Sequence, residues 1–146
     1  MMESTVLHVG FTVADLRAMA GFMRDCLGFT VTDPRRPPAT SIAEVTGVTG
    51  ADVELVYVSA PGLIMELLQY TSPTSATLAG GRPCDVGASH LALKVHDVAD
   101  IVQRAKAYGF EPAAPHLPEI AAGPNQGMRA TYIRDSHGFT IELMGG

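Results

Sequence analysis

The sequence has little cysteine, few aromatic residues and few positive charges. Its 146 residues include two cysteines, no tryptophan, and ten Lys and Arg against fifteen Asp and Glu, which gives a formal net charge of −5. Cys26 and Cys84 form no CxxC motif, so neither a disulfide framework nor a thiolate zinc site is indicated, and we expect Cys26 to pack in a core. An acidic chain offers no basic surface for a phosphate backbone, which argues against nucleic acid as a partner.

The sequence also lacks a long hydrophobic run. No segment approaches the roughly 20 apolar residues that a membrane-spanning helix requires, and the first residues, MMESTV, lack the basic and apolar regions of a signal peptide. We therefore expect a cytoplasmic protein with no membrane partner. With 47% hydrophobic residues, the chain is long enough to bury one sizeable core.

What the sequence does contain is an internal repeat, in which a histidine in an alternating strand pattern is followed seven residues later by an aspartate. The first copy runs from His8 to Asp15 (15 − 8 = 7) and the second from His90 to Asp97 (97 − 90 = 7). Each aspartate is a plausible N-cap, because its side-chain oxygen can accept hydrogen bonds from the free amides of a first helical turn. A glycine closes each predicted helix, 20 and 19 residues after the histidine (28 − 8 and 109 − 90).

Both halves then end with a turn glycine and a strand that carries a glutamate four residues later. Gly62 precedes Glu66 in the first half, and Gly138 precedes Glu142 in the second. Both glutamates lie between hydrophobic residues. A carboxylate in such surroundings needs a partner, because an isolated buried charge is costly.

These patterns predict an α+β fold made of two tandem βαβββ modules in a single domain, 1–146. The first module covers 4–70, the linker 71–86 and the second module 87–146. The predicted strands are 4–13, 29–33, 52–59, 63–70, 88–95, 110–114, 128–135 and 139–144, and the predicted helices are 15–28 and 97–108. The connection 39–50 is expected to be a loop, either a lid over a ligand or a surface excursion.

Four strand residues at matched positions of the repeat are the candidates for chemistry: His8, Glu66, His90 and Glu142. A single strand histidine or carboxylate is more often a hydrogen-bonded structural residue than a ligand. A pseudo-two-fold relation between the halves, however, would bring all four onto one concave surface. Two imidazoles and two carboxylates form a mixed nitrogen and oxygen set that suits Zn²⁺, Ni²⁺, Co²⁺, Mn²⁺ or Fe²⁺.

The motifs HxGxxVxD at His8, HxAxxVxD at His90 and DxxGxxIEL at the end of the chain resemble the vicinal oxygen chelate superfamily. This superfamily includes glyoxalase I, methylmalonyl-CoA epimerase, extradiol dioxygenases, fosfomycin-resistance enzymes and bleomycin-binding proteins. The resemblance implies two modules that form a curved sheet, or half-barrel, around a cavity. It also implies that the four matched residues are metal ligands, in the His/Glu/His/Glu set of bacterial-type glyoxalase I, whereas epimerases usually carry glutamine at the position of Glu66.

The function that this resemblance implies is a metal-dependent lyase or isomerase that acts on a small oxygenated substrate through an enediolate-type intermediate. Glu142 and Glu66 are the candidate bases, and the two histidines hold the metal. A homodimer is implied, with each metal site built either within one chain or across two. The alternatives are a metal-dependent oxygenase of the same superfamily and a non-catalytic protein that binds a small molecule or drug.

Other polar residues are secondary candidates. Tyr70 and Thr140 share the predicted faces of the two glutamates and could line a pocket. Arg129, Tyr132 and Arg134 lie on the strand beside Glu142, but alternation alone does not fix which way they face. The remaining histidines are expected at the surface because they lie in turns and loops: His96, His116 and His137.

Overall fold

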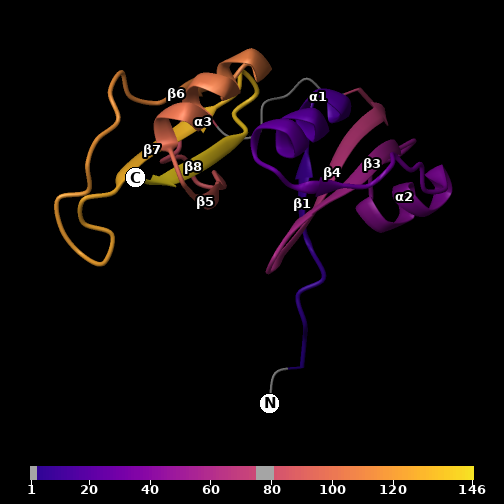
Figure 1. Cartoon of the computed structure of the whole chain (residues 1–146). Coiled ribbons are helices and arrows are strands. Elements are labelled where there is room, and N and C mark those ends of the chain that lie inside the picture. Colours follow the sequence, from indigo (N-terminus) through magenta and orange to yellow (C-terminus); the bar gives the residue numbers. More distant parts are fainter. Residues whose placement is uncertain (1–2, 75–80) are drawn as a thin grey trace. The chain divides into compact units, whose positions relative to one another are not determined.

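The computed structural model describes residues 3–74 and 81–146, which form two compact α+β units (Figure 1). The units are Met1–Ala76 and Thr77–Gly146. The predicted linker 71–86 therefore lies partly outside the described residues, at 75–80. No helix in the described parts of the chain is long and apolar enough to cross a membrane.

The first unit has one four-stranded sheet with the order β1-β4-β3-β2. Its β1 runs parallel to β4, and the other neighbours are antiparallel. A helix, α1, continues as a short π-helical segment, η1, and a second helix, α2, precedes β3. The elements are β1 (Val9–Thr12), α1 (Leu16–Gly21), η1 (Phe22–Cys26), β2 (Thr30–Val31), α2 (Ala39–Thr46), β3 (Asp52–Ala60) and β4 (Leu63–Ser72).

The second unit repeats this topology. Its sheet has the order β5-β8-β7-β6, with β5 parallel to β8 and the other neighbours antiparallel. The elements are β5 (Leu91–Val95), α3 (Val98–Ala105), η2 (Lys106–Tyr108), β6 (Glu111–Pro112), β7 (Arg129–Arg134) and β8 (Thr140–Gly145). The α+β class and the two tandem βαβββ modules are confirmed.

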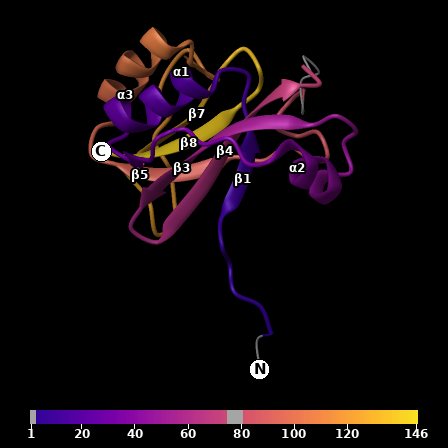
Figure 2. The same ribbon diagram turned by 90° about the vertical axis from the view of Figure 1, so that its right-hand side faces the viewer.

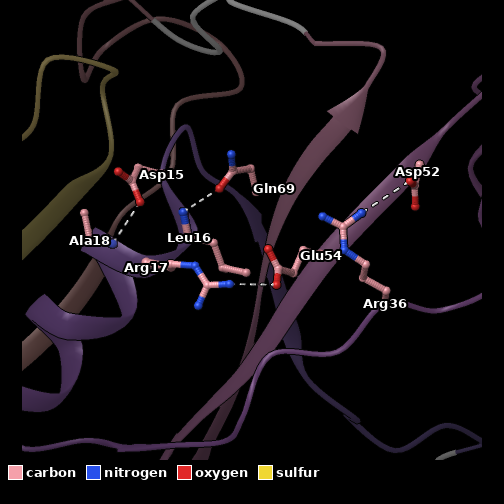
Figure 3. A network of polar contacts seen from close by, with 8 residues as sticks. All are labelled: Asp15, Leu16, Arg17, Ala18, Arg36, Asp52, Glu54 and Gln69. Atoms are coloured by element: carbon pink, nitrogen blue, oxygen red, sulfur yellow. Dashed lines mark hydrogen bonds and ion pairs between the residues drawn. The ribbon is translucent and has the colours of Figure 1, made fainter.

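The predicted aspartate caps begin both principal helices. Asp15 Oδ1 accepts a hydrogen bond from the Ala18 amide at 2.9 Å, and Asp97 Oδ1 accepts one from the Asp100 amide at 3.0 Å. In the first unit the Leu16 amide also donates to the side chain of Gln69 on β4 at 2.8 Å (Figure 3). This second bond ties the start of α1 to the strand that carries Glu66.

Alternation along the central strands directs the two glutamates away from the sheet faces that pack against α1 and α3. Met65 and Leu67 on β4, and Ile141 and Leu143 on β8, are fully buried. Because neighbouring strand residues point to opposite faces, the glutamate between each buried pair lies on the other face of its sheet. The first unit's buried face packs against α1, and the second unit's against α3.

The helices of the two repeats end differently. Between the capping aspartate and the closing glycine the first repeat has 13 residue steps (28 − 15) and the second has 12 (109 − 97). The first helix ends in the wider π-helical segment Phe22–Cys26, and the second ends in the tighter 3₁₀ segment Lys106–Tyr108. After each helix the backbone turns at a glycine with positive φ, 76° at Gly28 and 82° at Gly109.

Two sequence-based predictions need correction in the first unit. The strand predicted over 4–13 begins only at Val9, because residues 4–8 have no strand partner among the described residues. The connection 39–50, predicted to be a loop, contains the helix α2, which packs on β3. Figures 1 and 2 show α1 and α2 on opposite faces of this sheet, so α2 lies on the face that carries Glu66.

The cysteines behave as expected. Cys26 is buried at the end of the π-helical segment, and Cys84 is exposed with a free thiol. Cys26 is therefore a core residue, as its apolar surroundings in the sequence predict.

Candidate functional site

In the first unit, Glu66 lies at the centre of a three-strand row. On one side β1 places Gly10 opposite Glu66, and on the other side β3 places Tyr57 opposite it. Because side chains alternate along a strand, His8, two residues before Gly10, is directed to the same face as Glu66. The sheet register thus gathers a histidine, a glutamate and a tyrosine.

The three side chains are in contact. His8 Nε2 lies 3.5 Å from Glu66 Oε2, and the Tyr57 hydroxyl donates a hydrogen bond to the same oxygen at 2.8 Å. The rings of His8 and Tyr57 meet edge to face, with their centroids 5.8 Å apart. The histidine side chain is 34% exposed and the glutamate side chain 15% exposed, so the pair is half-buried but reachable from solvent.

Tyr57 is the polar residue that supports this glutamate. Its hydrogen bond to the Glu66 carboxylate, together with burial and the negative charge of the carboxylate, raises the pKa of Tyr57 above its ordinary value. The guanidinium of Arg35 lies 5.2 Å from the centre of the Tyr57 ring. The phenol therefore stays protonated and can act as a steady donor to Glu66.

The second unit has the same arrangement. Ala92 on β5 and Tyr132 on β7 lie opposite Glu142 on β8, and His90 is two residues before Ala92. His90 Nε2 lies 3.1 Å from Glu142 Oε2. Both histidine–glutamate pairs that the repeat predicts are therefore brought together, each within its own unit.

Both tyrosine rings lie beside the histidine of their pair, but the two hydroxyl groups approach different residues. In the second unit the Tyr132 hydroxyl lies 3.4 Å from Nε2 and 3.5 Å from Nδ1 of His90. The two rings are tilted by 37° with centroids 4.8 Å apart. Tyr132 thus packs beside the imidazole, whereas Tyr57 holds the carboxylate.

The spacing within each pair suits two ligands of one metal ion. Nitrogen and oxygen ligands about 2.0–2.2 Å from a metal lie about 2.8–3.6 Å from each other at right or tetrahedral angles. The two observed separations, 3.5 Å and 3.1 Å, fall in this range. Within residues 3–74 and 81–146, no group of three or more His, Cys, Asp or Glu side chains is placed to hold a metal. Within its own unit, each histidine–glutamate pair thus offers two potential donors.

The sequence was compared with models of known protein families. The profile of the Glyoxalase/Bleomycin resistance protein/Dioxygenase superfamily matches residues 5–143. The chain belongs to this superfamily. The resemblance carried by the histidine and glutamate motifs is confirmed. A comparison with curated protein sequences finds no match.

Solved structures share the glyoxalase-superfamily fold along nearly the whole chain. A glyoxalase family protein from Bacillus cereus has 20% identity and a TM-score of 0.81, covering 99% of this chain and 97% of its own. A trypanothione-dependent glyoxalase I from Leishmania major has 20% identity and a TM-score of 0.63, covering 98% and 87%. A mutant fosfomycin resistance protein FosX from Listeria monocytogenes, complexed with Mn(II) and a dihydroxypropylphosphonic acid, has 18% identity and a TM-score of 0.61, covering 99% and 92%.

The secondary candidates of this superfamily member are now placed. Strand alternation puts Tyr70 on the face of Glu66, and Thr140 on the face of Glu142, as predicted. The register also shows which way the residues of the strand beside Glu142 face. Tyr132 and Arg134 lie on the same face of the sheet as Glu142, and Arg129 lies on the opposite face. The three remaining histidines are exposed, as expected: His96, His116 and His137.

Sequence reasoning missed Tyr57. Tyrosine is a common strand residue, so its presence on β3 carries no signal alone. The signal lies in the repeat, because both modules place a tyrosine directly across from the strand glutamate, Tyr57 opposite Glu66 and Tyr132 opposite Glu142. Pairing the two hairpins by register, rather than comparing only histidines and carboxylates, would have found it.

We expect the raised pKa of Tyr57 to depend on Glu66. The phenolate absorbance of metal-free wild type and of Tyr57→Phe is measured as a function of pH. The difference between the two curves is the titration of Tyr57, and its midpoint should lie above about pH 10. In a Glu66→Gln background, the same subtraction should give a lower midpoint, because the negative acceptor is gone.

The sign of the linked stability effect follows from the raised pKa. The hydrogen bond stabilises the fold by about 1 kcal/mol below pH 10, and this contribution is lost as the pH rises through the pKa of Tyr57. Equal midpoints in both backgrounds would show that Tyr57 does not donate to Glu66. Circular dichroism at each pH confirms that the protein remains folded.

Proposed function

We propose that this protein is a metal-dependent lyase or isomerase acting on a small oxygenated substrate. In this proposal His8, Glu66, His90 and Glu142 are the ligands of one divalent ion, Zn²⁺, Ni²⁺, Co²⁺, Mn²⁺ or Fe²⁺. The observation that carries it is the duplicated register, in which each unit sets a histidine nitrogen and a glutamate oxygen 3.5 Å or 3.1 Å apart on the sheet face opposite the one that packs against α1 or α3.

The donor chemistry fits such an ion. Neutral imidazole nitrogen and carboxylate oxygen are the usual ligands of these metals. One histidine–glutamate pair offers two donors, and two pairs together offer the four that such an ion commonly binds. The Mn(II) bound to the fosfomycin resistance protein FosX supports manganese as one of the candidates. We further propose a cytoplasmic homodimer, with the chain as a single domain of two repeats. The four donors come either from one chain or from two.

Within this proposal the protein's own residues divide the work. A divalent ion bound here would supply stabilisation of negative charge on two adjacent substrate oxygens. His8 and His90 orient the site, and a glutamate takes a proton from a carbon that bears one of those oxygens and returns it to the neighbouring carbon that bears the other.

The contacts support Glu142 as the proton acceptor in preference to Glu66. The Tyr57 hydroxyl donates to Glu66 Oε2 at 2.8 Å, which restrains that carboxylate and engages one of its lone pairs. Tyr132 lies instead beside the ring of His90, on the other side of its pair. Glu142 can therefore change its contacts during a reaction with less rearrangement.

Metal binding tests the proposal. Chelator-treated protein is titrated with Mn²⁺, Ni²⁺, Co²⁺ or Zn²⁺ in a calorimeter, and the metal content of the loaded protein is then measured by elemental analysis. We expect one ion per chain. Two equal sites per chain would mean that each histidine–glutamate pair acts alone, and no binding would mean that the pairs are structural. Either result would contradict the proposal.

The reaction class has its own measurement. Metal-loaded protein is incubated in deuterium oxide with a panel of hydroxyaldehydes, hydroxyketones and their carboxylated analogues, and proton exchange at carbon is followed by nuclear magnetic resonance. We expect exchange that requires metal and is lost in Glu142→Gln. Metal-dependent consumption of dioxygen with the same panel, without exchange, would instead identify an oxygenase.

A further inference from the structure

We infer that the substrate carries an anionic group, a carboxylate or a phosphonate, and that Arg134 binds it. This inference rests on the proposed function and names the substrate class of the same site. Four observations support it: the register of Arg134, the fixed position of its guanidinium, the absence of a carboxylate partner among the described residues, and the residues at the matched position of the first unit.

The register places Arg134 beside the proposed metal ligand. On β7, Arg134 lies opposite Thr140, and Tyr132 lies opposite Glu142. Cross-strand partners point to the same face, so Arg134 shares the face of Glu142 and lies one row away from it.

The histidine of the pair borders the same row. On β5, Leu91 lies opposite Ile141 in a parallel pairing, so one step back brings His90 next to Thr140. His90, Thr140 and Arg134 therefore follow one another across three strands. Neighbouring strands are about 4.8 Å apart, which puts the backbones of His90 and Arg134 about 10 Å apart on one face of the sheet.

The guanidinium is held in place by neutral acceptors. Arg134 Nε donates to Thr140 Oγ1 at 2.9 Å, and Nη2 donates to the Gly81 carbonyl at 2.8 Å. Thr140 is itself buried and donates to the Gly138 carbonyl at 2.9 Å, which fixes the orientation of its hydroxyl. These contacts orient the guanidinium without neutralising its charge.

Among the described residues, Arg134 forms no ion pair with a carboxylate, although most arginines of this acidic chain do. Five arginines lie within 4.0 Å of an acidic side chain: Arg17, Arg24, Arg36, Arg82 and Arg104. Arg134 is half-buried. A half-buried, pre-oriented guanidinium with hydrogen-bond capacity left on Nη1 favours an anionic partner, because charge-assisted bonds to carboxylate or phosphonate are the strongest that arginine forms.

The first unit shows that the fold does not require an arginine at this position. There the residue two places before Glu66 is Ile64, and its partner on β3 is Ser59. Ile64 is 48% exposed, and no charged side chain is present in this pair. The two histidine–glutamate pairs are alike, but the adjacent row carries a cationic side chain in one unit and only uncharged ones in the other. That difference points to recognition of a substrate rather than to folding.

The test compares glycerate with glyceramide, which have the same adjacent hydroxyls but differ in charge. Calorimetric titration of Mn²⁺-loaded protein should show that the wild type prefers glycerate. Arg134→Gln should weaken glycerate binding about tenfold or more and change glyceramide binding less than about twofold. Arg134→Lys should recover part of the preference, because it restores the charge without the two-pronged geometry.

Arg129→Gln is the matched control, because it removes the same charge from the same strand on the other face. It should leave the binding of both probes unchanged. Equal loss of both probes in Arg134→Gln, or a wild type that does not prefer glycerate, would overturn the inference.

Manganese affinity, measured first on each variant, separates the two proposals. A wild type that binds no metal overturns both. Normal metal binding with no charge preference overturns only the role of Arg134. If Arg134→Gln is unfolded by circular dichroism, the result from Arg134→Lys decides, since equal affinity for the two probes in that folded variant would also contradict the inference.

Discussion

Replacing His90 by alanine should lower the affinity for a divalent metal by at least about 100-fold. Changes to residues that only orient metal ligands typically cost 10–100-fold, and loss of a ligand should exceed this. His90 Nε2 is 3.1 Å from Glu142 Oε2, so alanine also leaves that carboxylate without its neighbour. The measurement is a calorimetric titration of chelator-treated wild type and variant with Ni²⁺ or Mn²⁺.

His8→Ala provides a second reading of the same site, and His96→Ala is the control. If one ion uses both pairs, His8→Ala and His90→Ala should each weaken a single transition without changing its stoichiometry. His96 is exposed in the same unit as His90 and lies outside the pair, so its removal should have no effect. Loss of half the bound metal in each histidine variant would show two independent sites.

Phe110→Ala should destabilise the protein by about 3–5 kcal/mol. The Phe110 side chain is 1% exposed and packs edge to face against Phe139, with ring centroids 6.4 Å apart. Removing a buried aromatic ring loses its transfer free energy and leaves a cavity that the neighbours fill only in part. Because a domain of this size is typically stable by only 5–15 kcal/mol, this is a large fraction of the total.

Chemical denaturation with urea, followed by circular dichroism, measures this loss. The control is Val86→Ala in the same unit, since Val86 is 107% exposed and its truncation should change the free energy of unfolding by less than about 0.5 kcal/mol. A loss below about 1 kcal/mol in Phe110→Ala would show that the second unit does not depend on this aromatic contact.

The parts of the fold that were predictable are those with a local cause in the sequence. Asp15 and Asp97 were identified as caps because a short carboxylate before an amphipathic segment satisfies the first free amides, and both accept the expected hydrogen bonds. The central strands were predictable because short runs rich in hydrophobic residues, each bounded by turn residues, are typical of strands. Their observed limits, Leu63–Ser72 and Thr140–Gly145, differ from the predicted ones by at most two residues.

The parts that were not predictable lack such a signal. The helix Ala39–Thr46 has no buried residue and contains the β-branched residues Thr40, Ile42, Val45 and Thr46, so no apolar stripe marks it. Its one signal is Pro38, which occupies the N-cap position just before the first turn. Strand ends such as residues 4–8 depend on whether a neighbouring strand is present, which periodicity cannot reveal.

The site was predictable to the extent that it is duplicated. Equal spacing in the two halves singled out His8, Glu66, His90 and Glu142, and each unit brings its own histidine and glutamate together. That all four bind one metal ion stays a prediction. The tyrosine opposite each glutamate and the orientation of Arg134 follow from strand register, which the sequence does not state. Register is set by the length of each hairpin and by which face is buried, so finding it requires pairing the strands residue by residue and not only comparing matched positions of the repeat.

The π-helical segment Phe22–Cys26 shows where this architecture can gain or lose a residue. The first repeat has one residue more between its capping aspartate and its closing glycine, and its helix ends in the wider π-helical turn. An insertion within β4 or β8 would instead reverse every following side chain and turn Glu66 or Glu142 toward the core. Natural length variation among relatives should therefore be confined to helices and connections, leaving the histidine- and glutamate-bearing strands constant in length.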